Sequence, residues 1–213
     1  MAEHYFSETP SGDLAPREIE VVLAGAPRRV RTAGGVFSPE HLDRGTRVLL
    51  DAVEDGAGLL DGRPLDGAVL DLGCGWGPLA LAAALSRPEA EAWAVDVNER
   101  ARELTAANAE LLAVPNVRVA APDDVPDELR FAAILSNPPI RVGKAALHGM
   151  LRRWLPRLEP GGSAFLVVAK HLGAESLQRW IAAEFPGFEV ARAARDKGFH
   201  VIRVDQPRSS TIV

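Results

Sequence analysis

The pattern of apolar and polar positions changes period along the chain, and each change predicts a new element. Short apolar runs predict strands at 69–72, 91–96, 117–120, 131–136 and 163–169. Longer stretches with helical periodicity predict helices at 78–86, 98–112, 145–156 and 174–185. Because strands alternate with helices through short connections, we expect a Rossmann-like α/β fold with helices on both faces of a mostly parallel sheet.

The N-terminal part of the chain follows a different pattern. Residues 18–24 and 28–32 alternate polar and apolar positions around a Gly-Ala-Pro turn, which predicts a small β-hairpin. Ser38-Pro39-Glu40 predicts the start of a helix that runs to about Glu54. A polar, glycine-containing linker is expected over 55–67.

The C-terminal part predicts how the sheet is completed. The apolar runs 188–194 and 199–204 have no helix between them, so we expect an antiparallel hairpin that brings the sheet to seven strands. A length of 213 residues with 47% hydrophobic residues fits one domain with a full core. We expect an N-terminal extension over 1–60, a cofactor-binding core over 61–205 and a flexible tail over 206–213.

The run from Val69 to Leu79, V-L-D-L-G-C-G-W-G-P-L, carries the first chemical signal. An apolar strand breaks into a loop with Gly73, Gly75 and Gly77 and then opens a helix. Glycine permits positive φ and close approach of the backbone to a ligand, and a helix N-terminus favours an anionic group such as a carboxylate. Pro78 stands where the third glycine of a dinucleotide-binding loop would fall. The alternative interpretation is a tight strand–helix connection without a ligand.

Acidic residues follow the strands at the edge where such a fold binds ligands. Asp96 ends the strand 91–96 and can accept hydrogen bonds from both hydroxyls of a ribose, at a spacing near the roughly 20 residues typical of that role. It could instead cap the next helix, although Asn98 is the better cap. Asp71 is expected to orient the glycine loop. Asp123 or Asp124 could accept from an adenine amino group, or both could be turn residues.

Asn137-Pro138-Pro139-Ile140, directly after another apolar strand, carries the second signal. The Asn137 side-chain oxygen and the Pro138 carbonyl could accept the two N–H groups of a planar amine. That would align the nitrogen lone pair with a sulfonium methyl group for in-line displacement. The two prolines fix the backbone. With the glycine loop, this turn predicts methyl transfer from S-adenosylmethionine to nitrogen; the alternative is a proline turn that merely ends a strand.

Cysteine content and hydropathy narrow the class of protein. The single cysteine, Cys74, excludes an internal disulfide and is expected to be a small residue filling the glycine loop rather than a nucleophile. No apolar run approaches the roughly 20 residues of a membrane helix, and the N-terminus lacks a signal-peptide pattern. No Cys/His cluster has the spacing of metal ligands, so we expect no metal. These features favour a cytoplasmic protein.

Charge is distributed unevenly along the chain. A net charge of −5 argues against a generic polyanion binder. However, residues 141–213 hold 12 Lys and Arg against 6 Asp and Glu, whereas residues 1–140 hold 12 against 23. A basic C-terminal third could steer nucleic acid to one face, or it could be ordinary solvated surface.

Taken together, the glycine loop, the acid after the second core strand and the N-P-P-I turn resemble the class I S-adenosylmethionine-dependent methyltransferases. The chain is similar to their small-domain group, typified by bacterial 16S ribosomal RNA guanine-N2 methyltransferase, and to its single-domain archaeal relatives. Gly35–Ser38 with Leu42–Thr46 resembles the group's segment F-S-x-x-x-x-D-x-G-S/T. Asn137–Leu147 resembles its extended N-P-P stretch, and Lys197–Val201 its closing hairpin. The resemblance covers most of residues 4 to 204.

The resemblance implies roles for individual residues. Phe37 and the segment Asp43–Thr46 are expected to wall the cofactor and target pocket, and the backbone at Gly73 and Gly75 to bind the methionine part of the cofactor. The catalytic residues are expected to be Asn137, Pro138, Pro139 and Ile140. The full cofactor site is expected to comprise Phe37, Asp43, Gly45, Thr46, Asp71, Gly73, Cys74, Gly75, Gly77, Asp96, Val97, Asp123, Asp124 and Asn137.

One position departs from the group's pattern. The fourth residue of the N-P-P-x turn is often aromatic in amino-methylating enzymes, where it can stack on the target, but here it is Ile140. Stacking would then come from Phe37 or from the guanidinium plane of Arg141. Arg141 and Lys144 are also candidate phosphate contacts, with a solvated loop as the alternative.

The leading functional hypothesis is therefore guanine-N2 methylation of RNA, with ribosomal RNA or the small ribosomal subunit as partner. One alternative is methylation of a protein glutamine side chain or of a small-molecule amine. Another is a non-catalytic module that binds RNA or cofactor on the same fold. An RNA enzyme should carry positive charge around the mouth of the N-P-P pocket.

Overall fold

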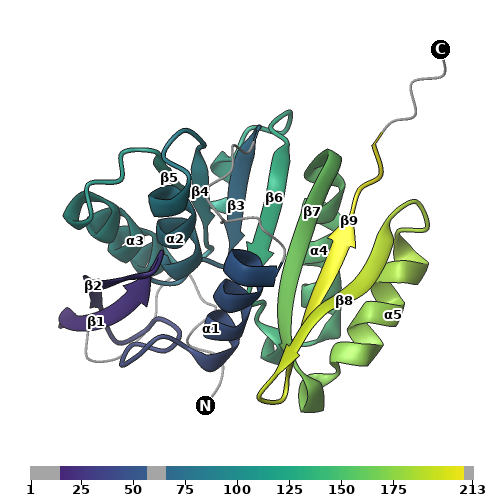
Figure 1. Ribbon diagram of the computed structural model, residues 1–213, viewed down its shortest axis with the longest axis horizontal. Coiled ribbons are helices and arrows are strands. Elements are labelled where there is room, and N and C mark those ends of the chain that lie inside the picture. Colours follow the sequence, from purple (N-terminus) through teal and green to yellow (C-terminus); the bar gives the residue numbers. More distant parts are fainter. Residues whose placement is uncertain (1–14, 57–65, 209–213) are drawn as a thin grey trace.

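The computed structural model describes residues 15–56 and 66–208. Within these residues, one seven-stranded sheet forms the centre of the molecule, with strands in the order β5-β4-β3-β6-β7-β9-β8 (Figure 1). The strands of this sheet are β3 Ala68–Leu72, β4 Ala92–Val95, β5 Val117–Ala120, β6 Phe131–Ser136, β7 Leu158–Ala169, β8 Glu189–Asp196 and β9 Phe199–Asp205. The first five run parallel, and β9 lies antiparallel between β7 and β8. The predicted sheet and its C-terminal hairpin are confirmed.

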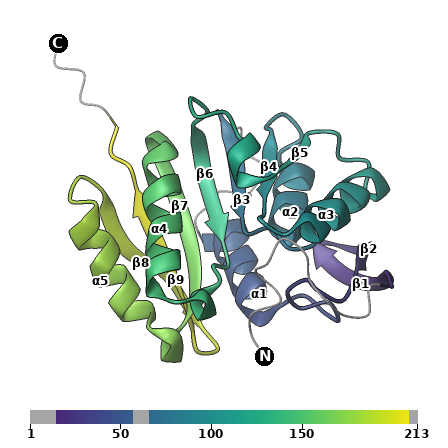
Figure 2. The same ribbon diagram turned by 180° about the vertical axis from the view of Figure 1, so that it is seen from behind.

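Helices cover both faces of the sheet (Figures 1 and 2). The helices are α1 Arg44–Asp51, α2 Pro78–Ser86, α3 Glu99–Leu111, α4 Lys144–Trp154 and α5 Ala174–Glu184. Apolar side chains of α1, α2 and α3 share one core cluster, and those of α4 and α5 share the cluster on the opposite face. Alternation along β3 divides the strand between them, since Val69 belongs to the first cluster and Leu70 to the second. Burial of both faces explains why the strands read as continuous apolar runs.

Short helical segments connect several of these elements. They are η1 Ala52–Gly56, η2 Pro122–Asp124, η3 Ile140–Val142, η4 Leu155–Arg157 and η5 Lys170–Leu172. Three of them, η2, η3 and η5, follow the parallel strands β5, β6 and β7 and so lie at the carboxyl edge of the sheet. This is the edge where α/β folds place their ligands.

The predicted N-terminal hairpin consists of β1 Arg17–Leu23 and β2 Ala26–Thr32. Its inner side chains belong to the same core cluster as α1 and α2. The buried amide of Asn108 in α3 joins the hairpin to the glycine loop, because its Nδ2 donates to the carbonyls of Arg31 at 2.8 Å and Trp76 at 3.0 Å. The N-terminal segment is therefore anchored beside the loop that it precedes in sequence.

Two predicted boundaries are wrong. The first helix begins at Arg44 rather than near Pro39, because Asp43 provides the N-cap and Ser38 has a φ of 50°, outside the helical region. The helix continues beyond Asp51 as the π-helical segment η1. The strand predicted at 163–169 begins earlier, at Leu158, and passes through the Gly161–Gly162 pair with a register shift. Much of the predicted linker 55–67 and the end of the predicted tail lie outside the described residues.

The C-terminal hairpin brings a loop to the carboxyl edge of the parallel strands. Lys197 and Gly198 both have positive φ, 46° and 85°, as a two-residue type I′ turn requires. Because β8 and β9 are antiparallel to each other and β9 is antiparallel to β7, this turn lies at the same edge as the carboxyl end of β7. A hydrogen bond of 2.8 Å from the Lys170 N–H to the Gly198 carbonyl joins the turn to η5.

Candidate active site

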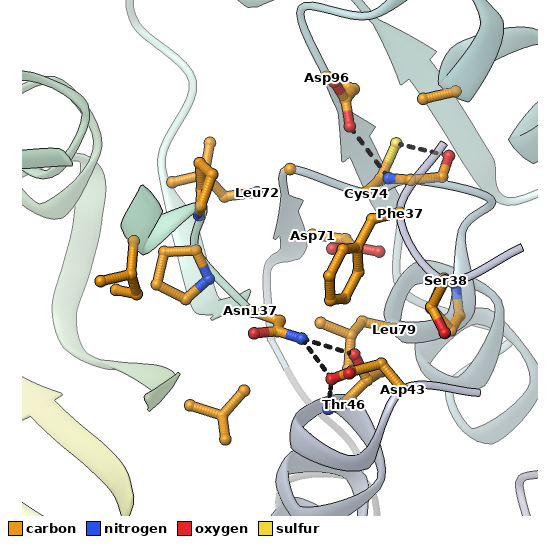
Figure 3. Close-up of a pocket in the computed structure, with 18 of the residues that line it drawn as sticks. Phe37, Ser38, Asp43, Thr46, Asp71, Leu72, Cys74, Leu79, Asp96 and Asn137 are labelled. Carbon is orange, nitrogen blue, oxygen red and sulfur yellow. Dashed lines mark hydrogen bonds between the residues drawn. The ribbon is translucent and has the colours of Figure 1, made fainter. Parts of the chain in front are cut away.

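A cavity of about 710 Å³ opens at the carboxyl edge of the sheet. This volume lies within the range of roughly 300–1,000 Å³ typical of ligand sites. Its wall combines the glycine loop after β3, the acid after β4, the N-P-P turn after β6 and the segment that precedes α1 (Figure 3). The structure thus brings together most residues that the sequence predicted, namely Phe37, Asp43, Thr46, Asp71, Gly73, Cys74, Gly75, Asp96, Val97, Asn137, Pro138, Pro139 and Ile140.

The three glycines of the loop differ in their surroundings. All have positive φ, 79° at Gly73, 59° at Gly75 and 93° at Gly77. A Cβ atom built on Gly73 or Gly75 would meet nothing within 4 Å, whereas one on Gly77 would lie 2.8 Å from the Thr105 side chain. Gly73 and Gly75 therefore leave space at the cavity wall, and Gly77 permits α2 to pack against α3. Cys74 is buried between them, and burial raises the pKa of its thiol well above the usual value, so the thiol stays protonated.

Asp71 is a buried carboxyl group directly beneath the loop. Its Oδ2 accepts a 2.9 Å hydrogen bond from the Ala80 N–H in the first turn of α2, which fits the expected role in orienting the loop. Its Oδ1 is buried and accepts no hydrogen bond from the described residues. Burial raises the pKa of Asp71 to about 7, although the Ala80 N–H opposes this shift.

Asp96 holds the other side of the glycine loop. One carboxylate oxygen accepts from the Gly75 N–H at 3.0 Å, and the other accepts from the Asn98 N–H at 2.9 Å. Asn98 caps α3 through its side-chain oxygen, which accepts from the Arg100 N–H at 3.0 Å, so Asp96 does not cap that helix. Burial raises the pKa of Asp96, and the two backbone donors partly offset the effect. Each carboxylate oxygen keeps a further lone pair for a ligand.

Asn137 lies opposite the glycine loop, in contact with the start of α1 (Figure 3). Its Nδ2 donates to Asp43 Oδ2 at 2.8 Å and to Thr46 Oγ1 at 3.0 Å. The following turn is tight, since the Ile140 N–H donates to the Pro138 carbonyl at 2.8 Å across Pro139, whose φ of −74° and ψ of 76° describe an inverse γ-turn. This bond uses one of the two acceptor positions of the Pro138 carbonyl.

Several predicted residues do not reach the cavity wall. Asp123 and Asp124 form η2, and Asp123 Oδ1 accepts from Arg153 Nη1 at 2.7 Å, so they occupy the turn position that was the alternative to an adenine contact. Gly45, Gly77 and Lys144 are also absent from the wall. The side chain of Arg141 lies outside what the structure describes.

Other wall residues gave no clear signal in the sequence. The segments α4, η5 and β9 contribute Met150, Trp154, His171, Leu172 and Phe199. Among them, only Phe199 lay in a segment singled out by resemblance. The apolar residues of α4 have the same spacing as ordinary core positions, so no sequence pattern separates them from the core.

The residues present fit a bound S-adenosylmethionine. The open space above Gly73 and Gly75 accommodates a backbone-bound ligand, and Asp71 Oδ1 offers a buried acceptor for an ammonium group. Asp96 lies at the end of β4, where it can accept from ribose hydroxyls. Within the described ranges, no group of three or more Cys, His, Asp or Glu residues could hold a metal ion, and no helix is long and apolar enough to span a bilayer.

Comparison with known proteins agrees with this geometry. The sequence model of the family described as methyltransferase small domain matches residues 27–203. The uncharacterised protein YbxB of Bacillus subtilis is 34% identical over 206 residues, which cover 95% of this chain and 98% of that protein. Ribosomal RNA small subunit methyltransferase C of Stutzerimonas stutzeri is 32% identical over 208 residues, covering 87% of this chain and 57% of that protein.

A solved methyltransferase structure is also similar to this chain. The 16S rRNA N2 G1207 methyltransferase of T. thermophilus, in complex with AdoMet and guanosine, matches with a TM-score of 0.74 and 25% identity over 92% of this chain and 52% of that one. The chain thus spans about half the length of these ribosomal RNA methyltransferases. Fold and site together define a class I S-adenosylmethionine-dependent methyltransferase. Within that class, the chain belongs to the methyltransferase small domain family.

Proposed function

We propose that this protein methylates the exocyclic N2 amine of a guanine in ribosomal RNA. The observation that carries the proposal is that Asn137 of the N-P-P turn lines the same cavity as Gly73 and Asp96 of the cofactor site. A methyl donor and a planar amine could therefore lie side by side. The two named relatives that methylate ribosomal RNA, one of them at guanine N2, support this substrate.

The protein's contribution to the reaction would be binding and alignment. S-adenosylmethionine, when bound, supplies an electrophilic methyl group on a sulfonium centre. Asp71 would hold its ammonium group and Asp96 its ribose hydroxyls. Asn137 Oδ1 and the second lone pair of the Pro138 carbonyl would accept the two N–H groups of the guanine amine, which turns the nitrogen lone pair toward the methyl group. These acceptors also stabilise the positive charge that develops on nitrogen, and the proton can leave after transfer.

The mouth of the cavity is suited to an unstacked base. Among the described residues, four of the six large apolar side chains that are exposed line this cavity, namely Phe37, Val97, Val142 and Leu172. Phe37 is 47% exposed, which is a high value for a phenylalanine in a folded domain. An aromatic ring at the mouth can stack on a base and replace the aromatic residue that Ile140 does not supply.

Basic side chains lie at the same edge of the sheet as this apolar mouth. Lys170 and His171 of η5, Lys197 of the β8–β9 turn, and Lys144 at the start of α4 are exposed at the carboxyl edge of the sheet. His171 itself lines the cavity. Positive charge there would attract the phosphates that flank a target base. This arrangement favours an RNA substrate over a small-molecule amine.

The test is methyl transfer from radiolabelled S-adenosylmethionine to three substrates from cells that lack this protein: total RNA, 30S subunits and protein extract. We expect label in RNA that digests to N2-methylguanosine. Asn137→Ala should abolish this transfer with cofactor affinity nearly unchanged, whereas Asp96→Ala should weaken cofactor binding at least tenfold by calorimetry. Label found only in protein would replace the proposal with glutamine methylation, and cofactor binding without any label would favour a small-molecule acceptor or a non-catalytic module.

A further inference from the structure

Among the described residues, the side-chain amide of Asn137 is held through its nitrogen end. Both hydrogen bonds that the structure gives this side chain involve Nδ2, which donates to Asp43 Oδ2 at 2.8 Å and to Thr46 Oγ1 at 3.0 Å. The two acceptors come from the start of α1, more than 90 residues earlier in the chain. Figure 3 shows the contact on the cavity side of α1.

The chemistry of the two acceptors fixes which way the amide faces. An amide turned by 180° would place Oδ1 against the Asp43 carboxylate, and two acceptors cannot form a hydrogen bond. An NH₂ group carries two hydrogens, and here two acceptors engage them. Nδ2 therefore has no hydrogen left for a substrate, and Oδ1 is the only part of the amide that can contact one.

The segment Asp43–Thr46, D-R-G-T, holds this contact in place. Asp43 is the N-cap of α1, and its Oδ2 also accepts from the Thr46 N–H at 3.1 Å, which fixes the carboxylate on the helix end. A Cβ atom on Gly45 would lie 3.0 Å from Asp43 Oδ2 and 3.1 Å from the Phe199 ring. Glycine at position 45 thus leaves room for the carboxylate between α1 and β9. Asp43 and Thr46 therefore accept the two hydrogen bonds from Asn137, and Gly45 leaves the space that the Asp43 carboxylate needs.

We propose that Asp43 and Thr46 are positioning residues that make Asn137 an obligate hydrogen-bond acceptor. The site then selects substrates that present an N–H group and disfavours those that present only an oxygen acceptor. This inference rests on the proposed function, because it assumes that Asn137 contacts the amine that is methylated. The sequence predicted that Asp43 and Thr46 contact the cofactor. The inference instead assigns their polar groups to Asn137.

The kinetic test compares variants that separate the helix cap from the bond to Asn137. Asp43→Ser keeps an N-cap oxygen but is too short to reach Asn137, whereas Asp43→Asn keeps both the cap and an acceptor at the same place. We expect Asp43→Ser to lower kcat about 10–100-fold with the cofactor Kd unchanged within about twofold, since small misplacements at a reacting centre have effects of this size. Asp43→Asn should restore most of kcat. Thr46→Val should lower kcat about 3–10-fold.

Glu40→Gln is the matched control, because Glu40 is an exposed acid three residues before Asp43 whose carboxylate lies 3.7 Å from the guanidinium of Arg17 and makes no contact with Asn137 among those that the structure describes. Its kcat and unfolding temperature should equal those of the parent. An unchanged kcat in Asp43→Ser would overturn the inference and leave the proposed function standing. A raised cofactor Kd in that variant with kcat retained would instead assign Asp43 to the cofactor.

A second measurement does not depend on activity. In ¹⁵N spectra, the NH₂ pair of Asn137, identified by its loss in Asn137→Ala, should show slow hydrogen exchange in the parent and fast exchange in Asp43→Ser. Fast exchange in the parent would contradict the inference. If the parent methylates no RNA while the exchange pattern is as expected, the proposed substrate fails and the acceptor role of Asn137 survives.

Discussion

Asp71 combines a contact within the fold with an acceptor that we propose binds the cofactor. Its Oδ2 serves the fold by accepting from the first turn of α2, and its Oδ1 lies buried without a partner among the described residues. Burial of such an acceptor costs stability unless a donor is supplied. In the absence of cofactor, the carboxyl group reduces this cost by staying protonated to a higher pH, because its pKa is raised to about 7.

This raised pKa predicts pH-dependent cofactor binding. If Asp71 binds the ammonium group of the cofactor as proposed, it does so in its ionised form, so affinity for S-adenosylmethionine should fall as the pH drops below about 7, by up to about tenfold per pH unit. Asp71→Asn should bind more weakly and with a much flatter pH profile. Calorimetric titrations between pH 5.5 and 8.5 would measure both profiles. Parallel profiles for parent and variant would show that another group, such as Asp96, is responsible.

The raised pKa of Asp71 has the opposite effect on the stability of the cofactor-free protein, which should fall as the pH rises. Asp71 is raised above its unfolded value of 3.8, so its contribution to stability is complete below about pH 4 and is lost as the pH rises through about 7. The cofactor's stabilising effect should therefore be larger at pH 8 than at pH 6. If Asp71 had a purely structural role, the stabilising effect of the cofactor would not depend on the ionisation of Asp71.

Among elements, the junction of the glycine loop with α2 and α3 has the strictest geometry. Gly77 is the N-cap of α2 with a φ of 93°, and the space that its Cβ would need is filled by Thr105 of α3. Thr105 Oγ1 in turn donates to the Gly75 carbonyl at 3.0 Å. Packing between the two helices thus supports the loop that lines the cavity.

A substitution at this junction should have a large effect on stability. Gly77→Ala combines backbone strain with a contact of 2.8 Å, so we expect a loss of about 2–4 kcal/mol in the free energy of unfolding. Gly149→Ala is the control, because Gly149 lies in α4 with nothing within 4 Å of its Cβ position. That change should stabilise by about 0.5–1 kcal/mol. Urea unfolding curves would measure both; equal midpoints would show that α3 yields to the extra methyl group.

At the scale of the whole molecule, two lysines from distant segments lie at the edge of the sheet where the carboxyl ends of the parallel strands meet. Lys170 and Lys197 are more than 25 residues apart in sequence but lie on segments joined by the hydrogen bond between η5 and the β8–β9 turn. Asp196 lies 3.3 Å from Lys197, but a surface pair of this kind contributes little and leaves the lysine available to a phosphate.

If the basic edge binds RNA, removing two of its charges should change the salt dependence of binding. We expect Lys170→Gln with Lys197→Asn to weaken RNA binding and to lower the salt slope by about 1.5, while cofactor affinity is unchanged. Asparagine is chosen at position 197 because it tolerates the positive φ. Arg118→Ala with Arg130→Ala removes two cations from β5 and from the residue preceding β6, and should leave the slope unaltered. Filter binding at several salt concentrations would decide, and equal slopes in both pairs would remove the edge from the RNA surface.

The sequence predicted the central sheet, its C-terminal hairpin and the residues that follow each strand, because these depend on short-range periodicity and on Gly, Pro and Asn at turns. The assignment of Asn98 as the cap of α3 was also local and is confirmed. The start of α1 was predicted wrongly, because Ser38-Pro39-Glu40 matches a helix start as well as Asp43 does. Only the packing of the preceding segment across the cavity distinguishes the two.

What the sequence by itself determined was the set of local signals, namely a glycine loop, an acid after the next strand and an N-P-P turn, and through their order the methyltransferase class. The tertiary structure decided the relations between distant segments. It directs both N–H groups of Asn137 toward the start of α1 and turns Asp123 toward Arg153. It also leaves Asp71 Oδ1 without a partner among the residues that the structure describes. The physical reason is that hydrogen-bond partners and burial depend on side chains brought together by packing, and no local pattern encodes which lone pair or N–H group will face the cavity.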